Sequence, residues 1–272
     1  MEKMMKEEEV EDVFYSPEKV MEEVKENGRN EVMMNINNNN YVEENKKFKI
    51  MRETVEKEDP ACKEIDDLTL RRFLRARDLD VEKASAMLMK YITWRRTFVP
   101  KGSISTSEIS NEIAQNKMFM QGTDKYGHPI ALVFGARHFC SKGGVEEFKR
   151  FLVFALDKLC SRIPHAQEKF IIIGDLEGYG YCNSDVRGYL AALSILQDYY
   201  PERLGKLYVV HVPYIFMTVW KIIHPIIDKN TKKKIVFVEN KRLQATLKED
   251  IDESQLPEIY GGKLKLVPIQ DA

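Results

Sequence analysis

The sequence has few cysteines, almost no net charge and no long apolar run. Its 272 residues include four cysteines that lie far apart and form no C-x-x-C pair, so reduced thiols are expected, and neither a zinc site nor a disulfide framework. The net charge of -1 argues against a protein that binds nucleic acid by bulk attraction to phosphate. The chain opens without a secretory signal pattern and lacks about 18 consecutive apolar residues. A cytoplasmic protein that does not span a membrane is therefore expected.

Motifs for catalysis are also missing. The chain contains no G-x-S-x-G and no G-x-x-x-x-G-K-[ST] motif, and its five histidines lack the H-x-x-x-H or H-E spacing of metal sites. The glycines of 178–183 follow a predicted strand, but Asn183 stands where a dinucleotide site needs Gly or Ala, so a tight loop is favoured. Asp175 and Glu177 form an acid pair at a strand end, which by itself indicates little. We therefore expect a protein that is not an enzyme and that binds no cofactor and no metal ion.

The sequence divides into three segments. Residues 1–44 are rich in Glu and Lys and then in Asn, which predicts a disordered tail. Residues 45–100 have a helical period, with Asp66 or Asp67 and Asp80 as helix caps, and predict a small helical lobe. From 101 to 272, strands alternate with helices, which predicts an α/β lobe with a largely parallel sheet and helices on both of its faces.

Residues 214–227 have the length of a helix but are apolar on nearly every side. At about 1.5 Å per residue they reach about 21 Å, too short to cross a hydrocarbon layer of about 30 Å. Strand-like runs flank the segment. It is either a crossover helix buried in the core or a helix that covers a cavity for an apolar molecule. Its apolar side chains include Tyr214, Phe216, Met217, Val219, Trp220, Ile222, Ile223 and Ile226.

Polar residues near this segment suit a phosphate and a polyol. Phosphate is bound by Arg and Lys, and neighbouring hydroxyl groups are bound by a carboxylate and a hydroxyl. Glu202, Thr231 and Lys234 offer these groups. Arg77 continues the apolar stripe of its helix, so it either extends its guanidinium into water or directs it toward an anion held by the second lobe. Each of these residues can also be an ordinary surface residue.

Several spaced motifs resemble those of the CRAL-TRIO family, whose members include phosphatidylinositol-transfer-like proteins. They are DDLTLRRFLRARDLDVEKA, DKYGHP, YYPERLGKLY, HPIID, TKKKI and LPEIYGG, and they cover about residues 60–266. The resemblance implies a non-enzymatic lipid-binding and transfer protein with a small helical lobe and an α/β/α lobe. In it, a gate helix at 214–227 would close a lipid cavity. One departure is Asp78, where such members often have Lys.

The same resemblance implies the ligand contacts. The headgroup of a phosphatidylinositol ligand would be held by Arg77, Glu202, Thr231 and Lys234. Lys229, Lys232 and Lys233 would contact an anionic membrane surface during transient peripheral association. We expect a cytoplasmic monomer. Alternatives are a carrier of another hydrophobic molecule, as tocopherol- and retinal-binding relatives are, or a module that senses lipid and binds a protein.

A second ligand can be judged from the predicted cavity wall. Members that exchange phosphatidylcholine have Tyr and Glu on one strand and Ser and Thr on its neighbour. By alignment these positions fall on Ala131, Val133, Phe170 and Ile172, which are all apolar. A choline phosphate would lack hydrogen-bond partners there, so little exchange of phosphatidylcholine is expected.

Overall fold

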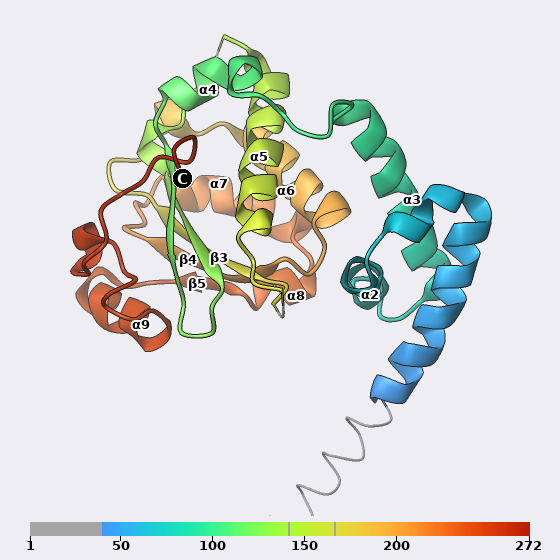
Figure 1. The fold of residues 1–272 in the computed structure, drawn as a ribbon. Helices are drawn as coiled ribbons and strands as arrows, with labels where there is room; N and C mark the ends of the chain where they lie inside the picture. Colours follow the sequence, from blue (N-terminus) through green and yellow to red (C-terminus); the bar gives the residue numbers. More distant parts are fainter. Residues whose placement is uncertain (1–39, 141, 166) are drawn as a thin grey trace, which may run out of the picture.

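The computed structural model describes residues 40–140, 142–165 and 167–272. Most of the segment 1–44 that was expected to be a disordered tail lies outside these residues. The helix over 40–58 takes in its last five positions. Glu44 pairs there with Arg71 of a later helix at 3.3 Å, a contact that composition alone does not indicate. Figure 1 shows a helical lobe beside a lobe built on a sheet, so the predicted mixed α/β class is confirmed.

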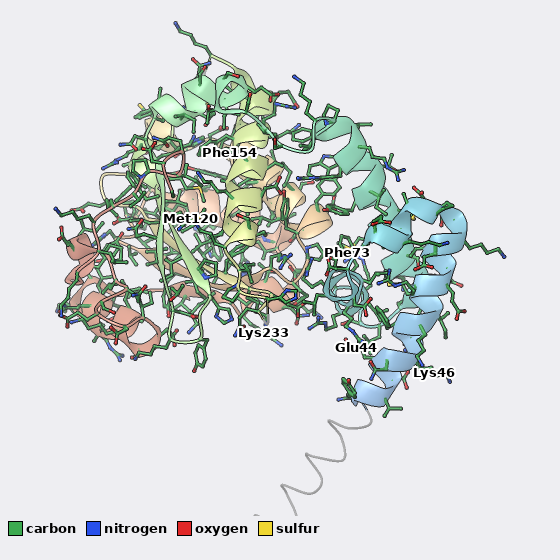
Figure 2. The ribbon with its side chains drawn as sticks, in the orientation of Figure 1. Glu44, Lys46, Phe73, Met120, Phe154 and Lys233 are labelled. Carbon is green, nitrogen blue, oxygen red and sulfur yellow. The ribbon has the colours of Figure 1, made fainter. Side chains whose placement is uncertain are left out.

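The helical lobe follows from caps and an apolar stripe. Its further elements are η1 (Pro60–Glu64), α2 (Asp67–Arg75) and α3 (Val81–Phe98). Asp66 accepts a hydrogen bond from the backbone of Thr69 at 2.8 Å and so caps α2, and Asp80 caps α3 in the same way. Phe73 is buried inside this lobe, whereas Met120 is buried in the sheet lobe (Figure 2).

The described strands form one sheet whose order follows the chain. They are β1 (Met118–Thr123), β2 (Pro129–Phe134), β3 (Phe170–Asp175), β4 (Leu204–Val210) and β5 (Ile235–Phe237). β1 is antiparallel to β2, and the other neighbours are parallel, as predicted. Right-handed crossovers between successive parallel strands place the connecting helices on one face of the sheet.

That face is covered by α5 (Gly144–Ser161), α6 (Val186–Tyr199) and α7 (Phe216–Ile223). The opposite face is covered by α9 (Leu243–Asp250) and the C-terminal segment (Figure 1). Helices therefore lie on both faces, as expected. The remaining short helices are η2 (Thr106–Ile109), α4 (Ser110–Ala114), η3 (Gly135–Arg137), η4 (Tyr181–Asn183), η5 (His224–Ile226), α8 (Lys229–Lys232), η6 (Asn240–Arg242) and η7 (Glu258–Tyr260).

The two faces of the sheet differ in how completely they are covered. On the α9 face, the strand residues Ile130, Leu132, Ile171 and Ile173 are at most 4% exposed. On the α7 face, apolar residues in the same strands or their neighbours stay half-buried: Val133, Ile172, Leu207 and Ile235. Apolar side chains at the centre of a sheet are normally sealed by the helices that pack on them. The helices on this face therefore leave apolar surface uncovered.

The segment expected to be one helix over 214–227 is shorter than predicted. α7 has 8 residues and is followed by the 3-10 turn η5. Pro225 explains this end, because proline lacks the backbone N–H that would continue the hydrogen bonds of an α-helix. The helix is also not buried all round. Val219 is 4% exposed, but Tyr214, Ile222 and Ile226 are 90%, 46% and 52% exposed. A crossover helix buried in the core is therefore excluded.

A buried polar network fixes the first turn of α6 to β1. The ammonium group of Lys117 donates to three acceptors: Glu112, Gln115 Oε1 (2.9 Å) and His138 Nδ1 (2.8 Å). Because Nδ1 accepts, the other ring nitrogen of His138 carries the proton and donates to Asp185 Oδ2 at 3.2 Å. Asp185 in turn caps α6 by accepting from the backbone of Gly188 at 2.9 Å. Burial, with the nearby charge of Lys117, lowers the pKa of His138, and Asp185 opposes this shift.

We expect this network to make the protein less stable as the pH falls below about 6.5, the ordinary pKa of histidine. The unfolded chain then binds a proton at this position while His138 in the folded chain stays neutral, so unfolding is favoured. The loss can reach about 1.4 kcal/mol per pH unit for one proton. Urea unfolding at about pH 7.5 and about pH 5.5 measures it. The His138→Gln variant, which keeps an acceptor and a donor, should lose less stability over this range; an equal loss would contradict the assignment.

Candidate functional site

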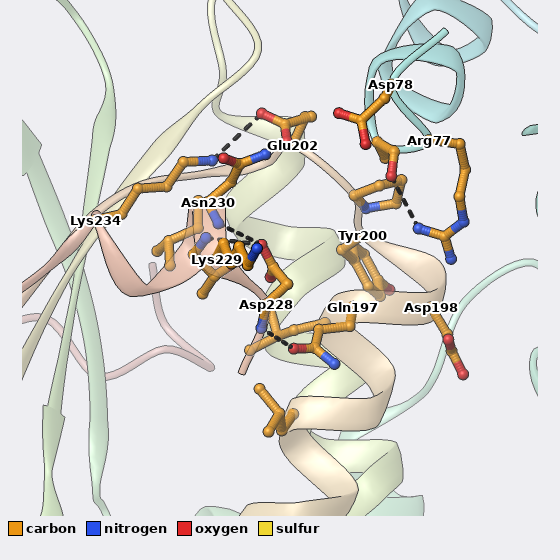
Figure 3. Close-up of a pocket in the computed structure, with 16 residues that line it drawn as sticks. Arg77, Asp78, Gln197, Asp198, Tyr200, Glu202, Asp228, Lys229, Asn230 and Lys234 are labelled. Atoms are coloured by element: carbon orange, nitrogen blue, oxygen red, sulfur yellow. Dashed lines mark hydrogen bonds and ion pairs between the residues drawn. The ribbon is translucent and has the colours of Figure 1, made fainter. Parts of the chain in front are cut away.

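A pocket of about 500 Å³ lies where the helical lobe meets the sheet lobe. Its wall comes from the C-terminal end of α2, the C-terminal end of α6 with the turn after it, and α8 with the start of β5 (Figure 3). The four residues predicted to hold a headgroup all line it: Arg77, Glu202, Thr231 and Lys234. The structure thus brings residues from positions 77 to 234 to one pocket. Their role in binding stays a prediction.

Ionic and aromatic contacts between the lobes hold the pocket together. Arg75 of α2 pairs with Glu168 at 2.8 Å, and the rings of Trp94 and Tyr199 stack with their centroids 3.8 Å apart. The hydroxyl of Tyr200, which lines the pocket, donates to Asp157 Oδ1 at 2.7 Å. Burial, with the charge of Asp157 beside it, raises the pKa of Tyr200. The first two contacts fix α2 and α3 to the sheet lobe, and the third fixes the turn after α6 to α5, so both walls of the pocket have defined positions.

The wall from the helical lobe contains a left-handed turn. Asp78 and Leu79 have φ angles of 50° and 61°, values that Asp tolerates better than most side chains do. The guanidinium of Arg77 donates from Nη1 to the carbonyl oxygen of Ala76 at 2.9 Å and turns away from Lys234 (Figure 3). Arg77 therefore lies across the pocket from the other predicted headgroup residues.

The opposite wall contains an ion pair between two predicted residues. Lys234 Nζ lies 3.3 Å from Glu202 Oε2, with 18% and 27% of the two side chains exposed. Glu202 has a φ of 56°, another left-handed residue in the pocket wall. Such backbone is uncommon for non-glycine residues and is found at ligand sites more often than elsewhere. The pair offers an ammonium group for an anion and a carboxylate for hydroxyl groups at one place.

Asp228 fixes the position of Thr231. Its Oδ1 accepts from the backbone N–H groups of Asn230 and Thr231, both at 2.9 Å, and its own N–H donates to Gln197 Oε1 at 3.1 Å. Burial acts to raise the pKa of Asp228, but hydrogen bonds from Thr231 outweigh it and the pKa is lowered. Asp228 and Gln197 were not predicted as pocket residues. An acid before K-N-T-K is a helix-cap signal that could have placed Asp228; no sequence signal indicated Gln197.

The charges at the pocket nearly balance. Among the described residues that line it are three bases and four acids: Arg77, Lys229, Lys234, Asp78, Asp198, Glu202 and Asp228. The predicted membrane-contact residues Lys232 and Lys233 lie next to it, at the end of α8 and just after it. The arrangement can donate hydrogen bonds to one anionic group and accept them from hydroxyl groups.

The four residues predicted to form a cavity wall share one face of the sheet. Ala131 pairs with Ile172 across β2 and β3, and all four pack on the side of α5 and α6. Ala131 and Phe170 are 0% exposed and belong to the core. Val133 and Ile172 are half-buried, so only these two contribute to the uncovered apolar surface.

A second polar cluster lies at the ends of β3 and β4. Candidate ligand atoms of Asp175, Glu177 and His211 lie within 4.8 Å of one another, which could suit a metal ion. However, Asp175 already accepts from His211 Nδ1 at 2.9 Å and from the hydroxyl of Tyr260 at 2.6 Å. Burial and the bond to Asp175 raise the pKa of Tyr260. The hydrogen bonds of this cluster therefore mainly connect the sheet to the C-terminal segment.

No helix in the described part of the chain is both long and apolar enough to cross a membrane.

Comparison with known proteins gives the family from the sequence, and a solved structure shares the fold. The CRAL/TRIO domain model matches residues 113–262, and the model of the CRAL/TRIO N-terminal domain matches residues 8–90. The chain is 31% identical to the Sec14 cytosolic factor of Schizosaccharomyces pombe, over 73% of this chain and 75% of that protein. It is 28% identical to the phosphatidylinositol transfer protein CSR1 of Eremothecium gossypii, over 74% of this chain but only 48% of that protein. A crystal structure of Sfh5 superposes with a TM-score of 0.64 at 20% identity, covering 84% of this chain and 90% of that one.

Proposed function

Because the chain belongs to the CRAL/TRIO domain family, we propose that it is a lipid carrier that binds a phosphatidylinositol-type phospholipid and exchanges it between membranes. The observation that carries this proposal is the pocket between the lobes, where Arg77, Glu202, Thr231 and Lys234 come together. The name of a relative that matches over most of this chain, a phosphatidylinositol transfer protein, supports the same ligand class. The proposed carrier catalyses no covalent step. It acts in the cytoplasm and contacts membranes only transiently.

The headgroup would be recognised by charge and hydroxyl groups together. The phosphodiester carries one negative charge, which Lys234 can bind through charge-assisted hydrogen bonds, together with Arg77 once its guanidinium turns into the pocket. The inositol ring offers only hydroxyl groups, which can donate to Glu202 and exchange hydrogen bonds with Thr231. Lys234 and Glu202 already lie 3.3 Å apart, so ligand binding would need little rearrangement of this pair.

The acyl chains would lie on the uncovered apolar face of the sheet, with α7 as the lid. Two aromatic contacts hold α7 in place: Phe216 packs edge-on against Tyr179, and Trp220 packs edge-on against Phe237, with centroids 5.7 and 5.0 Å apart. An aromatic pair adds about 0.5–1.5 kcal/mol beyond the area it buries. A lid of 8 residues can open at a membrane, where the exposed apolar side chains of this segment would find apolar surroundings.

Transfer assays should show movement of phosphatidylinositol with little movement of phosphatidylcholine. The half-buried positions Val133 and Ile172 offer a choline phosphate no hydrogen-bond partner, and an unpaired buried polar group costs about 1–3 kcal/mol. Each labelled lipid is followed from donor to acceptor vesicles, and lipid bound to the purified protein is identified by mass spectrometry. Comparable transfer of phosphatidylcholine would refute the selectivity. A bound terpenoid would indicate that the protein carries another hydrophobic molecule. If no lipid is bound, a module that senses lipid and binds a protein would be favoured.

A further inference from the structure

We propose that Asp78 limits this pocket to headgroups with a single phosphate, so that inositol lipids phosphorylated on the ring are rejected. This inference rests on the proposed function and adds a specificity-determining residue to it. The residue is notable because its charge has the same sign as that of the phosphate the pocket is expected to bind.

Asp78 differs from the other acids of the pocket in having no partner. Asp198 pairs with Lys90 at 2.8 Å, Glu202 pairs with Lys234 at 3.3 Å, and Asp228 accepts two backbone N–H groups. Within the described residues, no hydrogen bond or ion pair is formed by the carboxylate of Asp78. Asp78 is an exposed residue in the pocket wall, so its carboxylate is in contact with solvent and is not neutralised by an ion pair.

The carboxylate of Asp78 is also directed into the pocket. Figure 3 shows it pointing across toward Glu202, while Arg77 next to it in the chain turns the other way. The backbone N–H of Asp78 donates to the carbonyl oxygen of Arg75 at 3.1 Å, and that of Leu79 donates to Leu74 at 3.0 Å. With both residues in the left-handed region, the turn fixes the direction in which the side chain of Asp78 leaves the backbone.

A charge count shows what the pocket can accept. Three bases face four acids in the pocket wall, and Lys90 outside the wall pairs with Asp198, so the charges sum to about zero. One phosphodiester then leaves a net charge of about -1 in the pocket. A phosphate monoester on the ring adds a further charge of about -1.5 to -2 at neutral pH. That charge would be repelled by the unpaired carboxylate of Asp78. Repulsion between like charges disfavours binding of an inositol lipid with a ring phosphate.

The test compares Asp78→Asn with Asp198→Asn. Asn keeps the size of Asp and tolerates left-handed backbone, so the turn should survive. Asp198→Asn changes the net charge of the same pocket equally, but removes a carboxylate that Lys90 already neutralises. Each protein is incubated with phosphatidylcholine vesicles that contain equal amounts of phosphatidylinositol and phosphatidylinositol 4-phosphate, then re-isolated, and the bound lipids are quantified by mass spectrometry.

The wild-type protein should retain phosphatidylinositol and almost none of the 4-phosphate. Asp78→Asn should raise the ratio of bound 4-phosphate to phosphatidylinositol about tenfold, and Asp198→Asn by less than about twofold. An unchanged ratio in Asp78→Asn, or an equal rise in both variants, would overturn the role of Asp78 alone. If Asp78→Asn instead lost a bound lipid with an amine headgroup, the residue would be a cation-binding group. If neither the wild-type protein nor Asp78→Asn retains either inositol lipid, the proposed function is contradicted as well.

Discussion

Replacing Arg77 and Lys234 together by alanine is expected to abolish phosphatidylinositol transfer while the chain stays folded. The two cations reach the pocket from different lobes, Arg77 from the turn after α2 and Lys234 from the residue before β5. Loss of one partner of a buried, hydrogen-bonded charge pair costs about 2–5 kcal/mol of binding. That range corresponds to about thirtyfold to several thousandfold in affinity for each residue. Loss of Lys234 also leaves the carboxylate of Glu202 without its partner.

A matched control separates the site from the net charge. Lys83→Ala with Lys263→Ala removes the same two charges from side chains that are 72% and 69% exposed and form only surface ion pairs. Such pairs contribute little to stability, so this variant should transfer lipid normally. Far-ultraviolet circular dichroism and urea midpoints establish that both proteins are folded. Normal transfer by a folded Arg77→Ala, Lys234→Ala protein would exclude the pocket as the headgroup site.

The parts of the fold that depend on local periodicity could be predicted from the sequence. Alternation along a strand fixes which side chains share a face. The family alignment assigned Ala131, Val133, Phe170 and Ile172 to a cavity wall, and in the structure they share one face of the sheet. Helix caps are equally local, because a capping side chain bonds to backbone only a few residues away. Asp80 was predicted as a cap, as was either Asp66 or Asp67, and the structure shows Asp66 and Asp80 in this role.

The parts that depend on packing could not be predicted in this way. The apolar pattern of 214–227 indicates a helix, but whether its outer side meets core or solvent depends on α6 and β5, and Ile222 and Ile226 are exposed. The early end of α7 was in principle readable from Pro225. The half-burial of the α7 face was not, because the hydrophobic pattern of a strand is the same whether or not a helix seals it.

Contacts between polar residues that are distant in the sequence could also not be predicted. Lys117 and His138 are 21 positions apart, and Asp175 and Tyr260 are 85 apart. One sequence without homologues carries no signal for such contacts, and each residue is an ordinary polar residue by itself. The pocket residues Arg77, Glu202, Thr231 and Lys234 were identified from their chemistry and from the family resemblance. Their convergence came from the fold.

Replacing Ile226 by Asp is expected to weaken vesicle binding at least about tenfold and to slow lipid transfer equally, without loss of stability. Ile226 is 52% exposed on the outer side of the lid segment, near Ile222 and the exposed Lys229 and Lys233. Burying an isoleucine side chain in an apolar phase contributes about 1.5–3 kcal/mol. A carboxylate at this position loses that contribution and is repelled by anionic lipid, whereas an exposed position costs the fold little.

The chain provides a close control in Ile259, which is also 52% exposed and also lies in a 3-10 turn, η7. Its neighbour Tyr260 packs on the α9 face of the sheet, away from the lid. Ile259→Asp adds the same charge, so sedimentation with anionic vesicles compares the two positions directly. If both variants lose vesicle binding equally, the loss comes from net charge, and the outer side of α7 and η5 is not the membrane-contacting surface. If only Ile226→Asp loses binding, the membrane is contacted beside α7, the segment that must open for lipid to pass. Membrane binding and lipid release are then coupled, because both involve the same helix.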